Sequence, residues 1–397
     1  MSEALTAPDF TTIPVGPLAL IALPGCEELA AKIDAYLKTW REIRESEHKT
    51  TIAFSGYQRD SYLVKAAFPR FGSGEAKCHI QQSVRGYDIF IVCDMFNYGM
   101  TYKMYGRDNM SPDDHYANLK RAISAIGGKA RRITVIMPML YEGRQHRRSS
   151  RESLDCAMAL QELSDLGVDN IITFDAHDAR VQNAIPNHGF ENIQPAYQMI
   201  KALVKNVTDL KIDNDHLMII SPDEGGMSRC IYYSTVLGVD LGMFYKRRDY
   251  SVVIDGRNPI IAHEFLGDNV EGKDVIIVDD MISSGDSMIE VATKLKELKA
   301  RRIFICTCFG LFCNGLESFD KAYENGLISK VFTTNLIYRT PELKQREWYV
   351  EVDLSKYISY VIDTLNHDTS VSKLLDPKDR INKLLVDKGF RTAEEVR

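Results

Sequence analysis

The sequence predicts an α/β protein built from two similar domains, each a mainly parallel sheet flanked by helices. Three observations favour this class. A short apolar strand, a loop containing Gly or Ser and an amphipathic helix follow one another several times along the chain. The chain has 397 residues, which is enough for two domains of ordinary size. Its composition, with 45% apolar and 26% charged residues, is typical of globular proteins.

The same totals exclude several classes of protein. The net charge of -6 argues against a nucleic-acid surface, because neutralising phosphates requires an excess of Lys and Arg. The longest apolar runs have the length of strands, so we expect no membrane span. The first residues, MSEALTAPDF, lack the features of a secretory signal, and the cysteines form no CxxC pair. We therefore expect a cytoplasmic protein with reduced thiols and no zinc site.

The repeating unit can be followed along the chain. The first strand, in LALIALPG, leads into a helix whose apolar residues fall on one face. Further strands are expected in RITVIMPML, NIITFDAH, HLMIIS and DVIIVDD. Segments 40–66 and 95–117 have no clear periodicity, and we expect the second to be a long loop.

The simplest division of the chain gives two domains, at 17–190 and 191–350. A helix around 354–375 can pack on the first of them. Residues 376–397 are a charged helical tail, for which a solvated surface helix is the expected structure.

Residues 275–288, VIIVDDMISSGDSM, carry the strongest chemical signal. A buried strand is expected to end at Asp279 and Asp280, so the loop that follows lies at the carboxyl end of a parallel strand, where ligands bind. Backbone amides at a helix start, serine hydroxyls and a glycine suit a phosphate, while paired carboxylates suit sugar hydroxyls or a metal ion. The alternative is structural: Ser287 caps the helix with Glu290, and the aspartates are turn residues.

DDMISSGDS resembles the phosphoribosyl-binding loop of phosphoribosyltransferases and of ribose-phosphate pyrophosphokinases. Four more segments, in family order, are similar to the second family: GRQ (143–145), FDAHDARVQ (174–182), SPDEGGMSR (221–229) and YKRRDYSVVIDGR (245–257). SVRGYDIFIV and NHDTSVSKLL extend the likeness over most of residues 17–375. We interpret the chain as a divergent member of that family, which implies two phosphoribosyltransferase-like domains.

The resemblance implies a reaction. The diphosphoryl group of MgATP is transferred to the 1-hydroxyl of ribose 5-phosphate, giving 5-phosphoribosyl 1-diphosphate (PRPP) and AMP, with Mg²⁺ as the cofactor. Two alternatives stay open: a non-catalytic regulatory member that binds the same ligands, and, ranked below it, a phosphoribosyltransferase. A regulator has no need of a transition-state clamp, and the chain is too long for a single-domain transferase.

The resemblance also assigns roles to individual residues. Lys246 and Arg248 are the catalytic cations, expected to stabilise the transition state when a flexible loop closes. The ribose 5-phosphate loop comprises Asp279, Asp280, Ser283, Ser284, Gly285, Asp286 and Ser287. The pyrophosphate loop contains Asp223, Gly225 and Gly226, and the metal ligands are His177 and Asp223.

ATP is expected to contact two groups of residues. Arg144 and Gln145 act within their own subunit, and Phe71, Ser73 and Glu75 match the positions that the family supplies from a neighbouring subunit. We therefore expect a homo-oligomer built from dimers, up to a hexamer.

The chain departs from the family pattern at several positions. Ser283 replaces an acid and Asp286 a glycine in the ribose 5-phosphate loop, and Glu142 and His146 flank the Arg-Gln pair. Each single motif also has a structural interpretation. The basic run at Lys246 could be a solvated turn, His177 a structural histidine and Asp223 an Asx turn.

Overall fold

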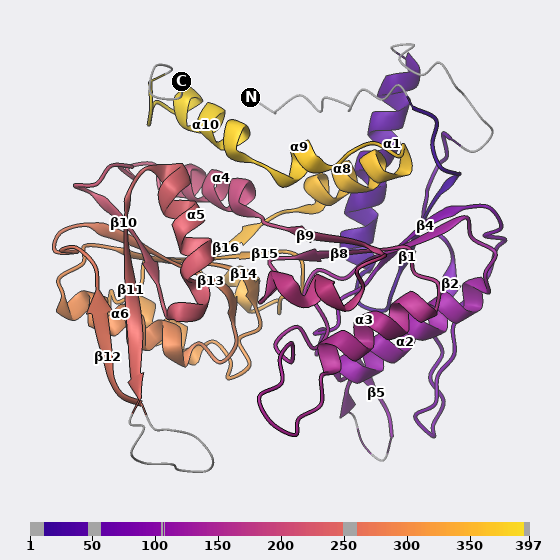
Figure 1. Ribbon diagram of the computed structural model, residues 1–397, viewed down its shortest axis with the longest axis horizontal. Helices are drawn as coiled ribbons and strands as arrows, with labels where there is room; N and C mark the ends of the chain where they lie inside the picture. Colours follow the sequence, from indigo (N-terminus) through magenta and orange to yellow (C-terminus); the bar gives the residue numbers. More distant parts are fainter. Residues whose placement is uncertain (1–11, 47–56, 105, 107, 249–259, 393–397) are drawn as a thin grey trace. The chain divides into compact units, whose positions relative to one another are not determined.

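The computed structural model describes residues 12–46, 57–104, 106, 108–248 and 260–392. The chain divides into two compact units (Figure 1). Unit 1 extends to Gln194 and also takes in Asn335–Tyr338 and Asp353–Leu375. Unit 2 comprises Pro195–Thr334, Arg339–Val352 and the chain from Asp376 onward. Each unit contains a mainly parallel sheet with helices packed on it, so the predicted fold class is confirmed.

Unit 1 is built on a five-stranded sheet with the order β1-β4-β7-β8-β9. Its strands are β1 (Leu18–Ala22), β4 (Asp88–Val92), β7 (Arg132–Ile136), β8 (Asn170–Phe174) and β9 (Gly189–Ile193). Each neighbouring pair is parallel. The first four strands are apolar and buried along nearly their whole length, as expected for a parallel sheet that is covered on both faces.

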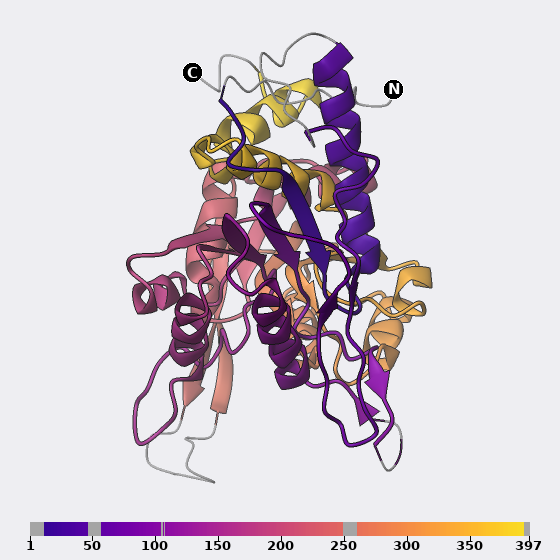
Figure 2. The same cartoon turned by 90° about the vertical axis from the view of Figure 1, so that its right-hand side faces the viewer.

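Helices of unit 1 lie on both faces of this sheet (Figure 2). On one face, α1 (Glu27–Ser46) packs against α8 (Ser355–Asn366). On the other lie α2 (Pro112–Ile126) and α3 (Asp155–Asp165). The 3₁₀ helix η1 (Ala179–Ala184) follows β8, and the short α9 (Ser372–Leu375) follows α8. The sequence predicts that a helix around 354–375 packs on the first domain. Asp353–Leu375, which contains α8 and α9, belongs to unit 1.

The segments without clear periodicity contain regular structure. α1 continues to Ser46. Its last turns bury Trp40, Arg41 and Arg44, and because two of these residues are charged, the sequence shows no apolar stripe there. The prediction of a loop throughout 95–117 was wrong, because α2 begins at Pro112, where Ser111 and Asp114 form a capping box. Unit 1 also carries two short antiparallel pairs: β2 (Ala66–Ala67) with β3 (His79–Ile80), and β5 (Thr101–Tyr102) with β6 (Asp108–Asn109).

Unit 2 contains a seven-stranded sheet with the order β12-β11-β10-β13-β14-β15-β16. The strands are β10 (Leu217–Ser221), β11 (Asp240–Arg248), β12 (Ile260–Leu266), β13 (Asp274–Ile282), β14 (Ile303–Gly310), β15 (Lys330–Thr334) and β16 (Tyr349–Val352). Neighbours are parallel except β11 and β12, which are antiparallel. The chain passes from β10 to one side and returns to its other side at β13. The carboxyl ends of β10 and β13 therefore form a topological switch point, the usual place for a ligand.

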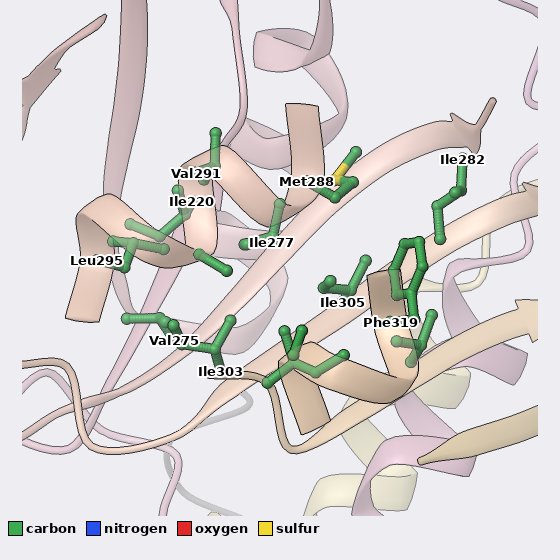
Figure 3. Packing of buried hydrophobic residues seen from close by; sticks show 14 of the residues in the cluster. Ile220, Val275, Ile277, Ile282, Met288, Val291, Leu295, Ile303, Ile305 and Phe319 are labelled. Carbon is green, nitrogen blue, oxygen red and sulfur yellow. The ribbon is translucent and has the colours of Figure 1, made fainter. Parts of the chain in front are cut away.

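The core of unit 2 lies between this sheet and two helices, α6 (Asp286–Glu297) and α7 (Glu317–Glu324). Figure 3 shows Met288, Val291 and Leu295 of α6 packed over residues of β13 and β14. The unit also contains α4 (Ala196–Asn206), α5 (Met227–Leu237) and the 3₁₀ helices η2 (Glu224–Gly226) and η3 (Leu343–Gln345).

The charged tail is part of unit 2. It forms α10 (Lys378–Asp387), which packs against α4 and α5 and buries Ile381 and Leu385. The prediction of a solvated surface helix was therefore wrong for one face of α10. Two apolar residues four positions apart share that face and are buried. Within the described residues, no helix combines the length and the apolar character needed to cross a membrane.

Candidate active site

The two predicted aspartates lie inside β13 rather than at its end. The strand continues to Ile282, because Met281 and Ile282 still pair with β14 at Phe309 and Gly310. Asp280 is buried, and its backbone N–H donates to Asp279 Oδ1 over 2.9 Å. Both carboxylates thus stand close to the carboxyl edge of the sheet, at the switch point.

The electrostatics of Asp279 are unusual for a carboxylate. Burial raises its pKa well above the ordinary range, and the like charge of Asp280 raises it further. Arg229, in the first turn of α5, opposes this shift, with an Nη1–Oδ1 distance of 3.6 Å. A carboxylate that is largely shielded from water beside an arginine is typical of a functional site, although ion pairs in the core can show the same property.

The loop after β13 combines a glycine of positive φ with the start of a helix. Gly285 has φ of +94° and precedes α6 directly. A Cβ atom at this position would lie 2.3 Å from Cε2 of Phe319, so only glycine fits. The alternative prediction, in which Ser287 caps the helix, was wrong. α6 begins at Asp286, and its N-cap is Gly285, which makes no side-chain cap. The N-terminus of α6 is therefore not closed by a strong side-chain cap, which suits the binding of an anion.

The side chains of this loop differ in exposure. Ser283 and Ser284 are half-buried, and Ser284 Oγ accepts weakly from Asp286 N over 3.4 Å. Asp286 and Ser287 are exposed. The acid that departs from the family pattern at position 286 thus faces solvent rather than the core.

A second loop lies at the end of β10. Asp223 caps η2, with its Oδ1 accepting from Gly225 N over 2.9 Å, which is the Asx turn that the sequence allows. Gly226 is buried, and a Cβ there would lie 3.6 Å from Asp279 Oδ1. The pyrophosphate-type loop and the aspartates of β13 are therefore neighbours within unit 2.

The predicted catalytic cations fall at the edge of what the structure describes. Lys246 pairs with His263 and Arg248 with Ile260 in the β11–β12 ladder. Their side chains, and residues 249–259 of the predicted flexible loop, lie outside the described part of the chain.

Unit 1 brings two of the predicted nucleotide segments together. Arg144 and Gln145 are exposed in a turn after β7, where Gln145 N donates to Glu142 O over 2.8 Å. The ring of the next residue, His146, lies 5.5 Å from that of His177, which follows β8. The GRQ and FDAHDARVQ segments therefore share one edge of the unit 1 sheet.

An acid that sequence reasoning did not single out anchors this region. His146 Nε2 lies 3.3 Å from Asp178 Oδ2, and Arg180 Nε donates to Asp178 Oδ1 over 2.9 Å. Arg180 holds the pKa of Asp178 well below its ordinary value.

Phe71, Ser73 and Glu75 lie together in the turn between β2 and β3 of unit 1. All three are exposed, and Ser73 Oγ donates to Glu75 Oε2 over 2.9 Å. Phe71 is 49% exposed, which is unusual for a large aromatic side chain on a turn. This arrangement is compatible with a contact to another chain.

The two candidate metal ligands belong to different units, His177 to unit 1 and Asp223 to unit 2. Among the described residues, no group of three or more His, Cys, Asp or Glu side chains could hold a metal ion. Mg²⁺ does not need such a group, since it binds one or two carboxylates together with phosphate oxygens and waters. Asp223 fits that chemistry, whereas the imidazole of His177 is a softer donor.

Sequence reasoning missed the role of Arg229. The residue lies in the quoted SPDEGGMSR segment, but its partner Asp279 is in another motif. The sequence shows only that Arg229 is the single cation of its segment, and the proximity of Asp279 follows from the fold.

Comparisons with known proteins agree with this organisation. Residues 18–167 match the N-terminal domain of ribose phosphate pyrophosphokinase, and residues 188–334 match the phosphoribosyl transferase domain. The ribose-phosphate pyrophosphokinase of Vibrio cholerae is 28% identical over 320 residues, covering 79% of this chain and 92% of that protein. The ribose-phosphate pyrophosphokinase of Shewanella oneidensis is 29% identical over 322 residues, with 79% and 91% covered.

A solved structure shows the same fold. Phosphoribosylpyrophosphate synthetase from Mycobacterium smegmatis matches with a TM-score of 0.69 and 20% identity, covering 88% of this chain and 99% of that one. The two domain matches follow each other in the order that the sequence predicts. The chain therefore belongs to the ribose-phosphate pyrophosphokinase family.

Proposed function

We propose that the protein is a ribose-phosphate diphosphokinase. It transfers the diphosphoryl group of MgATP to the 1-hydroxyl of ribose 5-phosphate and produces PRPP and AMP. One observation carries the proposal: the loop after β10 and the aspartates and loop of β13 are neighbours at the switch point of unit 2, with Gly226 next to Asp279. A site for a diphosphoryl group beside a site for a sugar phosphate is what this reaction requires.

The loop of residues 283–287 binds the 5-phosphate. The amides at the start of α6 and the hydroxyls of Ser284 and Ser287 donate to phosphate oxygens, and the positive end of the helix dipole adds to this attraction. Asp279 and Asp280 accept hydrogen bonds from the ribose hydroxyls and thereby fix the C1 oxygen. A phosphate and a polyol are thus bound by one loop and one strand end.

The diphosphoryl group binds at the loop of Asp223, Gly225 and Gly226, where small residues allow the backbone to approach it closely. Asp223 would hold Mg²⁺, which would supply positive charge against the ATP phosphates. His177, the second ligand that the family resemblance names, belongs to unit 1. When the C1 oxygen attacks the β-phosphorus, the bond from that phosphorus to the α–β bridging oxygen breaks and AMP leaves. Lys246 and Arg248 stabilise the charge of the transferring group in the transition state.

Arg144 and Gln145 contact the nucleotide within the subunit, and Phe71, Ser73 and Glu75 contact the adenine of a neighbouring subunit. The exposure of Phe71 supports this second contact. The active protein is then a homo-oligomer built from dimers.

The experiment that tests this function mixes the purified full chain with ATP, MgCl₂ and ribose 5-phosphate and measures AMP and PRPP. Both products in equal amounts are expected. A protein that binds both substrates and forms neither product is instead a regulatory member of the family. Formation of PRPP only from a nucleotide and diphosphate would indicate a phosphoribosyltransferase.

A further inference from the structure

Arg229 connects the two loops of the candidate site in unit 2. Its guanidinium Nη1 lies 3.6 Å from Asp279 Oδ1, and the two side chains are only 11% and 20% exposed. The pair spans from the first turn of α5, directly after the loop of Asp223, to the strand that carries the ribose 5-phosphate loop. An ion pair shielded from water in this way is stronger than one on the surface.

The backbone around Arg229 is fixed to both strands. The adjacent Cys230 is fully buried, and its Sγ donates to the carbonyl oxygen of Val278 over 3.3 Å. Ser221 Oγ donates to Asp223 O over 2.7 Å at the end of β10. The first turn of α5 therefore has a defined position relative to β13, so the direction of the Arg229 side chain is set before any ligand binds.

The charges at this point call for a cation. Burial is the main cause of the raised pKa of Asp279, and the negative charges of Asp280 and Asp223 raise this pKa further. Arg229 is the largest influence in the opposite direction. Without it, the side chain of Asp279 would turn toward water, because a carboxylate that loses its cation beside the buried Asp280 gains from solvation.

We propose that Arg229 is a positioning residue for the ribose 5-phosphate site, acting through Asp279, which it holds in the orientation that accepts hydrogen bonds from the sugar. This inference rests on the proposed function and deepens it. Arg229 itself does not contact the transferring diphosphoryl group. Its removal therefore weakens sugar binding and leaves the chemical step intact once the sugar is bound.

The test compares Arg229→Met, Arg229→Gln and Arg229→Lys in the full chain by steady-state kinetics. Both neutral variants are expected to raise KM for ribose 5-phosphate about tenfold, the effect of weakening one hydrogen bond to a charged group. They are expected to leave kcat and KM for ATP within about twofold of the original values, because the interaction lost is made equally in the ground and transition states. Arg229→Lys should recover most of the loss, since an ammonium restores the charge but not the shape of the guanidinium.

Arg301→Met is the matched control. Arg301 forms an ion pair of 2.6 Å with Asp274 at the opposite end of the same strand. Its loss lowers the stability of unit 2 and should leave KM for ribose 5-phosphate unchanged. Melting curves of all variants separate such stability effects from the effect on KM.

Three results would overturn the inference: a fall in kcat with KM for ribose 5-phosphate unchanged, an equal rise in KM for ATP, or a lysine variant no better than the methionine one. The first two would indicate that Arg229 contacts the diphosphoryl group directly. The inference on Arg229 can fail while the unsubstituted protein is fully active.

If the unsubstituted protein forms no AMP and PRPP, the proposed function fails. The Arg229 variants are then compared by their dissociation constants for ribose 5-phosphate, measured by calorimetry. A protein that does not bind ribose 5-phosphate overturns both.

Discussion

Arg41 of α1 and Asp363 of α8 form an ion pair with an Nη2–Oδ1 distance of 3.3 Å, and both side chains are completely buried. Arg44 also pairs with Asp363, and Arg41 donates to Asn366 Oδ1 over 2.7 Å. Helices from the two ends of the sequence thus share one buried polar network within unit 1. The folding of the first half of the chain depends on residues near its end.

Replacing Asp363 with Asn should strongly destabilise unit 1. Two buried guanidinium groups would lose their shared carboxylate, and breaking a buried pair in this way costs about 3–5 kcal/mol. Urea denaturation of the full chain measures the change. Asp368→Asn is the matched control, because Asp368 is 78% exposed at its pair with Arg132 and its removal should cost about 1 kcal/mol or less. Equal effects of the two substitutions would contradict this account.

His367 should make stability depend on pH. Burial lowers its pKa to about 4, with Arg41 and Arg44 adding to the effect against the opposing charge of Asp363. The unfolded chain binds a proton at this residue below about pH 6.5, whereas the folded protein does not until about pH 4. The free energy of unfolding therefore falls as pH drops through this window, by up to about 1.4 kcal/mol per pH unit.

Urea denaturation at pH 7.5, 6 and 5 checks this dependence. His367→Asn should reduce the slope of stability against pH, and His79→Asn, at an exposed position of β3, should leave the slope as it is. An unchanged slope in His367→Asn would show that other groups cause the dependence.

The sequence predicts the fold of this chain well wherever strands are buried on both faces. Runs such as DVIIVDD are apolar because parallel strands are covered by helices, and that pattern needs no knowledge of distant residues. Prediction fails where a helix buries charge. The last turns of α1 hold Arg41 and Arg44, whose partner Asp363 is more than 300 residues away, so local periodicity gives no signal.

The candidate site is predictable for a different reason. Asp279 and Gly285 lie in one short segment, and the ligand edge of a parallel sheet follows from the order of strand, loop and helix. Arg229 was missed because its contact with Asp279 depends on how two neighbouring strands align, which single-sequence reasoning does not provide.

Gly285→Ala should disrupt the ribose 5-phosphate loop. The added Cβ would overlap the ring of Phe319 in a backbone conformation with φ of +94°. Because a displacement of about 1 Å at a binding group costs tenfold or more, the dissociation constant for ribose 5-phosphate should rise by at least that factor. Calorimetric titration measures it. Gly272→Ala is the control: its φ of +76° has the same strain but faces open space, so stability falls by about 1 kcal/mol and affinity is kept.

The hydroxyls of Ser284 and Ser287 should govern the affinity for ribose 5-phosphate. The Ser284→Ala, Ser287→Ala double variant removes two donors to a charged ligand, each worth about 1.5 kcal/mol or more, so the dissociation constant should rise by about a hundredfold. The control is the double variant Ser370→Ala, Ser372→Ala, which removes two exposed hydroxyls that bond to each other in unit 1. Unaltered affinity in the first double variant would reject the assignment.

Lys246→Ala should reduce turnover far more than it weakens ATP binding. The proposed contact of Lys246 forms chiefly in the transition state, when charge builds on the transferring group, and removing one such interaction lowers kcat by about 10²–10³. Initial rates over a range of ATP concentrations separate kcat from KM. Lys299→Ala, which removes an exposed lysine paired with Glu271, should change neither constant. A rise in KM for ATP as large as the fall in kcat would mean that Lys246 binds the ground state equally well, and its role as a transition-state cation would then be rejected.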